Sequence, residues 1–132
     1  MSIYEKDNLT IIRKKGDIPN ILFLKIKETI LGKNYNLTIV FCTPKESKLR
    51  NKEYRDKNYP TNILSFPLSK NEGEIYISLS TARRDAHIFE MSYQKFLHLL
   101  VIHGVLHLKG HSHGSTMEKL EHKYLNKFFR GS

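Results

Sequence analysis

Four segments of the chain carry the short alternating or β-branched apolar runs that are typical of strands. The last two runs are separated by a turn-rich stretch at residues 69–73, which reads Ser-Lys-Asn-Glu-Gly. We therefore predict strands at residues 8–13, 36–42, 62–66 and 74–79.

Apolar residues at helical spacing, or polar runs compatible with a helix, fill most of the remaining chain. Asp17 can cap a first helix, whose apolar stripe ends at Gly32. The polar residues 45–55 are compatible with a second helix, and a proline follows them. A third helix opens near Ser80 and runs to about His87. The order of elements therefore alternates between strands and helices.

The most apolar segment starts near Ser92. Its apolar residues lie on nearly every side of the predicted helix, so this helix is buried, and Gly110 is a natural stop for it. Ser115 and Glu118 have the spacing of a capping box, which predicts a last helix with one apolar face. We expect an α+β (mixed α/β) fold in one domain of residues 1–132, with a central sheet of about four strands and about five helices.

Composition narrows the class of protein. Apolar residues make up 39% and charged residues 27% of the 132 residues, which excludes disorder by composition. Lysine and arginine together number 22 against 13 acidic residues, a formal net charge of +9. This charge favours a polyanionic partner, either nucleic acid or an anionic membrane, although it can also serve solubility alone.

The single cysteine, Cys42, excludes an intramolecular disulfide and a cysteine-based zinc site. The first ten residues have no apolar signal-peptide core, and no apolar stretch is long enough to span a bilayer. We therefore expect a cytoplasmic protein with no membrane partner and no disulfide partner.

Three histidines have the spacing of ligands for one metal ion. His103 and His107 lie four residues apart on the buried helix, so their imidazoles project from one face. Gly110 lets the chain leave the helix and bring His113 to the same ion. Three imidazoles and a water form a catalytic zinc site, whereas buried imidazoles without a metal need other partners. The pattern predicts one Zn²⁺ per chain at the end of a buried helix.

The residue after the first of these histidines argues against a peptidase. The spacing of the three histidines is that of a long metalloprotease signature, in which a glutamate follows the first histidine and acts as general base. Here that position is Gly104, which cannot accept a proton. Zinc lowers the pKa of a bound water and polarises phosphoryl oxygens, so phosphodiester hydrolysis suits the site and the positive charge.

Three blocks of the sequence resemble one known family. Residues 103–113 read His-Gly-x-Leu-His-Leu-x-Gly-x-x-His, residues 49–67 contain Asn-x-x-Tyr-Arg and then Pro-Thr-Asn-Ile-Leu-Ser-Phe-Pro, and residues 73–78 read Gly-Glu-Ile-Tyr-Ile-Ser. In this order they resemble the signature of the YbeY endoribonucleases, also called rRNA maturation factors. Two positions depart from it, because Ser112 and Glu74 stand where the family usually has aspartate. A carboxylate lost beside the ligands would weaken metal binding if it supports them.

The resemblance implies a zinc-dependent endoribonuclease, a hydrolase that cuts phosphodiester bonds of single-stranded RNA in the cytoplasm. It implies a role in rRNA maturation, notably of the small-subunit rRNA, and in ribosome quality control. The expected partners are ribosomal RNA and the ribosome or its small-subunit proteins. The expected fold has a central sheet with the zinc at one end of a cleft.

The resemblance also implies roles for individual residues. Arg55 matches the functional arginine of the family, and its forked guanidinium suits a phosphate and the charge that develops on it. His103 is the histidine that we expect to serve catalysis as well as metal binding. Ser65 is expected beside the cleft, where it can bind substrate. Tyr54 can stack on a base, or it can simply pack against the protein.

Two other functions stay open at this point. The chain can be a ribosome- or RNA-binding assembly factor with a structural zinc, a hypothesis favoured by the lack of an obvious general base. It can also be a metallopeptidase-like hydrolase, against which Gly104 argues. Three imidazoles suit zinc first, but nickel, cobalt and copper also bind such sites.

Overall fold

Backbone pairing joins the strands into one sheet, whose central strands β3 and β5 bury most of their side chains. The computed structural model describes residues 1–130, so the last two residues of the predicted domain lie outside the described ones. The sheet has five strands in the order β1-β2-β3-β5-β4. Only the β2–β3 and β3–β5 pairs are parallel, and β4 lies at one edge. The strands are β1 (Ser2–Lys6), β2 (Leu9–Arg13), β3 (Asn36–Cys42), β4 (Ile63–Ser69) and β5 (Glu72–Ser78).

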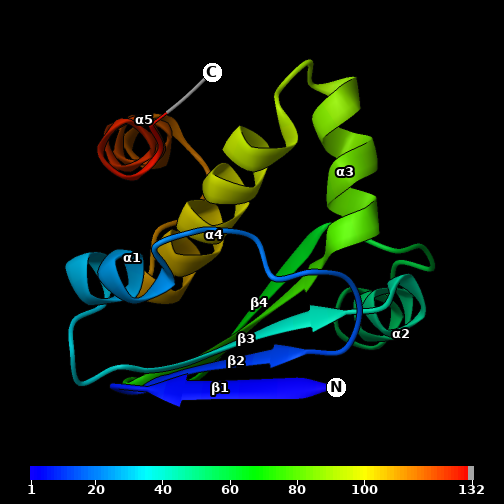
Figure 1. Cartoon of the computed structure of the whole chain (residues 1–132), viewed down its shortest axis with the longest axis horizontal. Coiled ribbons are helices and arrows are strands. Elements are labelled where there is room, and N and C mark those ends of the chain that lie inside the picture. The colour runs from blue at the N-terminus through cyan, green and yellow to red at the C-terminus, as the bar shows by residue number, and fades with distance from the viewer. Residues whose placement is uncertain (131–132) are drawn as a thin grey trace.

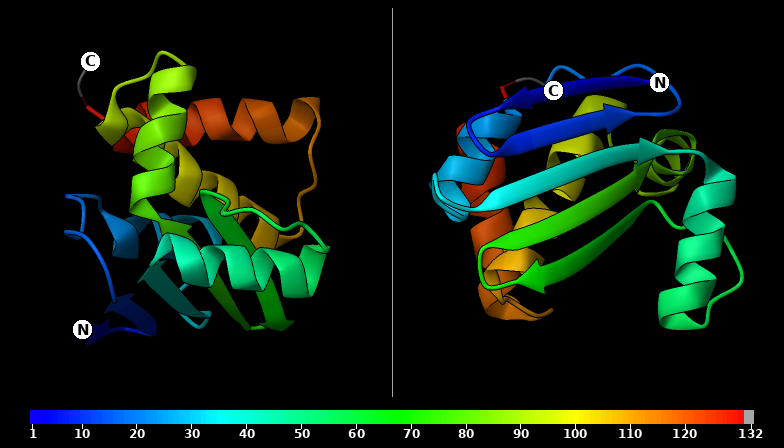
Figure 2. Two further views of the ribbon diagram at one scale, coloured as in Figure 1. Left: turned by 90° about the vertical axis from the view of Figure 1, so that its right-hand side faces the viewer. Right: turned by 90° about the horizontal axis from the view of Figure 1, so that it is seen from below.

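Five helices pack around this sheet, as Figures 1 and 2 show. They are α1 (Phe23–Ile30), α2 (Pro44–Arg55), α3 (Leu79–Ile88), α4 (Tyr93–Lys109) and α5 (Ser115–Phe128). Helices α1, α4 and α5 lie over the face that carries the main hydrophobic core, with α4 in the middle. Helix α2 packs near the other face, where a smaller cluster includes Val40, Leu64 and Tyr76. The predicted α+β fold in a single domain is confirmed.

Helix α4 is buried almost all round, as its sequence predicts. Leu97, Ile102 and Val105 have no measurable exposure, and they contribute to the core between the sheet and the other helices. The side chain of Ser92 caps the helix by accepting a hydrogen bond from the Lys95 amide. Gly110 ends the helix with φ of 112°, a left-handed conformation that disfavours side chains. The helix that carries two of the predicted ligands is therefore held rigidly against the sheet.

Strand β4 places successive side chains on opposite faces of the sheet. Ser65 faces α4, because its hydroxyl donates to the carbonyl of Gly104 at 3.3 Å. Phe66 faces α2, because its ring packs 4.7 Å from the ring of Tyr54. The strand therefore joins the buried helix to the end of α2.

Strand β1 and the start of helix α1 differ from the predictions made on sequence. Strand β1 is an additional strand, and all of its residues are exposed, so no burial pattern marks it in the sequence. Helix α1 begins at Phe23 instead of near Asp17, because the amide of Ile21 bonds to the Pro19 carbonyl and only Ile26 starts the helical bonding, to Leu22.

The predicted capping box at the start of α5 is wrong, because Ser115 is already the first helical residue. Gly114 occupies the cap position, and no side chain there makes a capping hydrogen bond. Among residues 1–130, no helix combines the length and the apolar character needed to cross a bilayer.

Candidate metal centre

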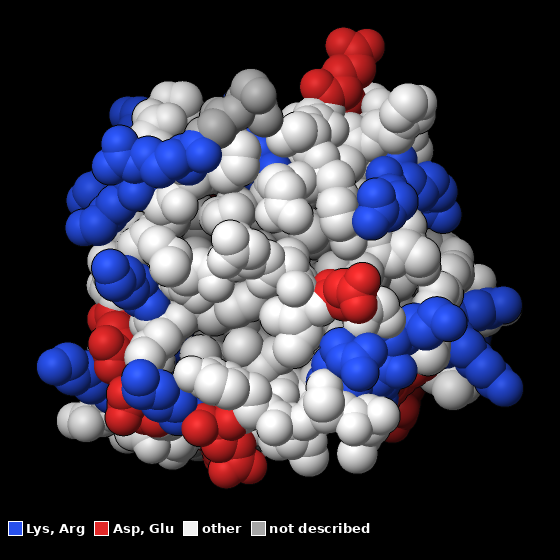
Figure 3. Space-filling model, viewed as in Figure 1, with Lys and Arg blue, Asp and Glu red and all other residues white. Residues whose placement is uncertain are grey.

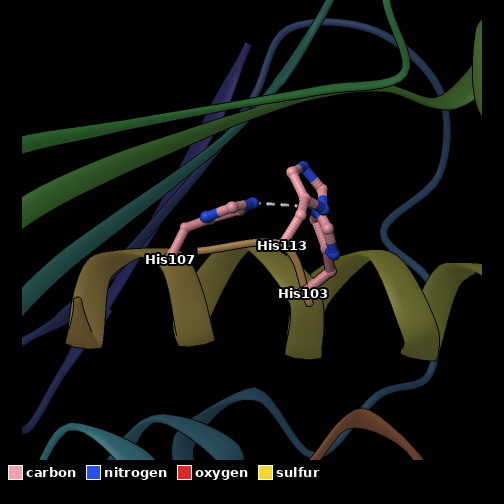
Figure 4. Close-up of side chains that lie close together, drawn as sticks. All are labelled: His103, His107 and His113. Carbon is pink, nitrogen blue, oxygen red and sulfur yellow. Dashed lines mark hydrogen bonds between the residues drawn. The ribbon is translucent and has the colours of Figure 1, made fainter. Parts of the chain in front are cut away.

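The last turns of α4 and the loop after it bring three imidazoles together, as Figure 4 shows. His103 and His107 project from α4 toward the same space, and His113 reaches that space from the loop between α4 and α5. One ring nitrogen from each residue lies within 4.8 Å of the other two. Nε2 of His103 and Nε2 of His107 are 3.1 Å apart. The three residues form a group that can hold a metal ion.

The hydrogen bonds behind two of these rings fix which nitrogens face the centre. Nδ1 of His103 lies 3.1 Å from a carboxylate oxygen of Glu121, and Nδ1 of His107 lies 3.0 Å from the carbonyl of His111. Both partners are acceptors, so each Nδ1 carries a proton and donates it. In the neutral rings, both Nε2 atoms then present lone pairs to each other.

Two lone pairs at 3.1 Å repel unless a cation lies between them. Two nitrogens bound at about 2.0–2.1 Å to a tetrahedral ion lie roughly 3.3 Å apart, close to the spacing found here. A proton shared by the two Nε2 atoms would also remove this repulsion, but it would involve only two imidazoles. Here His113 brings a third ring nitrogen to the same space. The donor set therefore fits a tetrahedral metal ion with one position open.

Burial helps to keep the ligands in the form that binds metal. It lowers the pKa of His107 below its usual value, and the neighbouring His103 lowers it further. The hydrogen bond to the His111 carbonyl acts in the opposite direction. A lowered pKa favours the neutral imidazole, which is the form that coordinates a metal.

Gly104 lies at the closest approach between α4 and the sheet. A Cβ atom at this position would lie 2.8 Å from Cδ1 of Ile63 and 3.0 Å from Cδ1 of Ile75. The hydroxyl of Ser65 would be 3.1 Å away. The residue that is the general base in metalloproteases is therefore replaced by one that packs helix against strand. The site lacks that carboxylate and also the room for one.

A pocket of about 630 Å³ opens beside the histidines. It is bounded by α4, by β4 and by the end of α2, and none of its described lining residues is acidic. All six residues that the sequence suggested for the site line this pocket: Tyr54, Arg55, Ser65, His103, His107 and His113. The structure thus brings together every predicted site residue, from segments far apart in the sequence.

Arg55 ends α2 and is exposed to solvent. Within residues 1–130 its guanidinium makes no ion pair and no side-chain hydrogen bond, so its five donors are free for a ligand. Tyr54 is 58% exposed, although one face of its ring packs on Phe66. A base and a phosphate of one ligand can therefore reach these two side chains together.

The loop between α2 and β4 is tied down by two buried polar side chains of α2. The hydroxyl of Ser47 donates to the carbonyl of Thr61 and accepts from the Thr61 amide. The amide group of Asn51 donates to the carbonyl of Tyr59 at 2.9 Å. These bonds fix the distance between the end of α2 and β4, and so they position Arg55 relative to the histidines.

Two groups of the site were not found from the sequence. Glu121 lies 18 residues from His103 and on another helix, so no local spacing connects the two residues. The carbonyl of His111 supports His107, although the His111 side chain is not part of the ligand group. Every residue has a backbone carbonyl, so the sequence does not reveal which carbonyl accepts a hydrogen bond from a histidine.

The comparisons with known proteins agree with this geometry. The family model described as "Endoribonuclease YbeY" matches residues 4–129, which is nearly the whole chain. The chain belongs to the endoribonuclease YbeY family. The resemblance seen in the sequence is thereby confirmed, and with it membership of an enzyme family.

Relatives from distant organisms carry the same family description. The endoribonuclease YbeY of Pelagibacter ubique is 37% identical over 110 residues, covering 76% of this chain and 72% of its own length. That of Phytoplasma mali is 32% identical over 121 residues, covering 89% and 78%. The solution structure of TM1509 from Thermotoga maritima is similar with a TM-score of 0.64 and 28% identity, and the match covers 89% of this chain and 87% of that one.

Proposed function

We propose that this chain is a zinc-dependent endoribonuclease that hydrolyses phosphodiester bonds of single-stranded RNA. Membership of the endoribonuclease YbeY family supports the reaction class. The observation that carries the proposal is a single pocket that joins the three-histidine group to Arg55 and has no acidic lining residue among those described. Such a pocket attracts a polyanion.

Three imidazoles and an open position are the ligand pattern of catalytic zinc, so zinc is the ion that we propose for the site. When bound, zinc acidifies water and polarises a phosphoryl oxygen, which is the chemistry that phosphodiester hydrolysis requires. His103, His107 and His113 would hold the ion. We assign His103 a role in catalysis as well as in metal binding, and Glu121 holds its ring from behind.

The protein side chains around the ion would bind and orient the RNA. Arg55 offers a forked, permanently charged donor to the non-bridging oxygens of the scissile phosphate, where negative charge develops. Tyr54 exposes a ring on which an unpaired base can stack, which favours single strands over duplexes. Ser65 lines the pocket and can bond to the ribose or the phosphate when its bond to Gly104 opens.

We place this activity in the cytoplasm, in the maturation of small-subunit rRNA and in ribosome quality control. The support for this placement is the resemblance described above and the net charge of +9, which suits an RNA-rich partner such as the ribosome. Ribosomal RNA and small-subunit proteins are therefore the partners that we propose.

A variant of Arg55 tests the proposed function directly. Zinc-quantified protein should cleave a labelled single-stranded rRNA fragment, and Arg55→Ala should lower the rate by about 100-fold or more, since one lost donor to developing charge costs on this order. Lys25→Ala is the control, because Lys25 is exposed on α1 and lines no part of this pocket. Equal cleavage by wild type and Arg55→Ala would overturn the assignment.

A second function deserves a test because the described pocket residues include no carboxylate that can act as general base. In this alternative, the chain is an assembly factor that binds RNA or the ribosome and needs zinc only for its structure. It predicts tight RNA binding without turnover, and unfolding when a chelator removes the zinc. A folded, metal-free protein that regains cleavage with zinc would exclude this alternative.

A further inference from the structure

We infer that Glu121 is the residue that positions His103 for metal binding, an inference that rests on the metal site of the proposed function. Glu121 lies on α5, and its side chain is only 17% exposed. One of its carboxylate oxygens is 3.1 Å from Nδ1 of His103, whose own side chain is 22% exposed. Within residues 1–130 this is the one contact of a carboxylate with a histidine of the metal group.

The contact has the geometry of a support for a metal ligand. A carboxylate that accepts the proton of Nδ1 fixes the ring in one tautomer, with the lone pair of Nε2 directed at the metal. The nearby negative charge also makes that lone pair a stronger donor. His107 receives the weaker version of the same support, since its partner is the neutral carbonyl of His111. The two α4 ligands are therefore supported unequally.

The position of Glu121 also bears on a departure from the family pattern. The family usually has aspartate immediately before its third histidine, and this chain has Ser112 there. Ser112 is exposed, and its hydroxyl makes no hydrogen bond with the part of the chain that the structure describes. In this chain a negative charge beside the histidines comes from Glu121 on α5, which contacts His103.

Packing holds Glu121 in place. Met117 and Leu125, one turn before and one turn after it on α5, are both buried in the main core. Because α5 is anchored on each side of the carboxylate, the contact with His103 does not depend on a flexible surface side chain. The loop that carries His113 connects α4 directly to α5. The third histidine and the carboxylate of Glu121 therefore come from consecutive parts of the chain.

Zinc affinity tests this inference, measured by competition with a chromophoric chelator. Removing a supporting partner of a ligand typically weakens metal binding by about 10–100-fold, so Glu121→Ala should weaken zinc binding by that factor. Glu121→Gln should recover part of the loss, because its amide oxygen still accepts a hydrogen bond but brings no charge. Glu118→Ala is the control, since Glu118 is exposed on the same helix, and it should bind zinc like wild type.

A spectroscopic measurement on the metal-free proteins separates positioning from a general structural role. Nitrogen chemical shifts of His103 should show the Nδ1–H tautomer in wild type and a mixture of tautomers in Glu121→Ala. A purely structural role would lower the melting temperature and leave zinc affinity and the tautomer unchanged, and that result would overturn the inference.

The inference and the proposed function fail in different ways. Wild-type zinc affinity in Glu121→Ala, together with normal RNA cleavage, would overturn the inference alone. Weakened zinc binding in Glu121→Ala, with no RNA cleavage by zinc-loaded wild type, would sustain the inference and overturn the proposed function.

Discussion

Gly104 separates two chemistries that use the same spacing of histidines. In a metalloprotease the residue at this position supplies the general base. Here Ile63 and Ile75 pack against the glycine, and their Cδ1 atoms would lie 2.8 Å and 3.0 Å from a Cβ. The residue that removes the base thus also sets how closely α4 packs on the sheet.

Restoring the missing carboxylate should damage the fold without creating a peptidase. Gly104→Glu forces a charged side chain between helix and strand, so we expect the free energy of unfolding to fall by roughly 2 kcal/mol or more. Urea unfolding measures this loss. Lys109→Glu is the control at an exposed position of the same helix, and it should cost less. A stable Gly104→Glu protein that cleaves peptides would contradict this account.

At the scale of residues, the sequence predicts what is local and misses what is not. His103 and His107 are visible because helix geometry puts residues four apart on one face. The return of His113 is visible because Gly110 permits a left-handed turn. Glu121 is not visible, because the packing of α5 on α4 decides which acidic residue reaches the ring. Side chains brought together by tertiary packing need the structure.

At the scale of elements, α4, the loop after it and α5 form one unit around the metal site. Helix α4 supplies two of the histidines that can hold a metal ion, the loop supplies the third, and α5 supplies the carboxylate behind His103. The loop itself has little hydrophobic anchoring, since residues 112–116 are all exposed. A metal ion would therefore order this segment most.

Removing the metal should loosen this unit and leave the sheet intact. With a chelator present, we expect faster amide hydrogen exchange at residues 110–121. Amides of β3 and β5 should keep their protection, because Ile39, Phe41, Ile75 and Ile77 form a core with no measurable exposure that does not involve the metal. Loss of protection throughout the sheet would instead support a structural zinc.

Elements were predicted well where several signals agree. Helix α4 is apolar on all sides, starts at a serine cap and ends at a glycine, and its observed bounds follow these signals. Strand β1 has no such signals, because it is exposed on both faces and is held by pairing with β2. The early start expected for α1 failed because an aspartate and a proline are compatible with a turn as well as with a helix.

At the scale of the whole molecule, the charge is unevenly distributed. Figure 3 shows basic side chains gathered over α2, over α3 and beside α5, around a mostly uncharged middle beside which an acidic group lies. On α2, Lys48, Lys52 and Arg55 follow one another at helical spacing, so they share one face that leads to the pocket residue Arg55. This face can follow an RNA backbone toward the histidines.

Charge removal on this face should weaken RNA binding in a salt-dependent way. For the double variant Lys48→Gln/Lys52→Gln, we expect weaker binding of single-stranded RNA and a slope of log K against log salt that is smaller by about 1–1.5, since each lost phosphate contact removes about 0.7. Fluorescence anisotropy at several salt concentrations measures both. The control Lys25→Gln/Lys33→Gln alters exposed lysines outside the pocket. An equal loss in both variants would show that net charge alone acts.

We propose that one metal ion, held by the three histidines, makes the chain a ribonuclease. The most direct test titrates metal-free protein with zinc while cleavage of a labelled single-stranded RNA is followed. We predict that the rate rises in proportion to added zinc and levels off at one equivalent, and that His107→Ala shows no such rise. Full cleavage by the metal-free protein, or the same zinc response in His107→Ala, would show that cleavage does not depend on a metal ion held by these histidines.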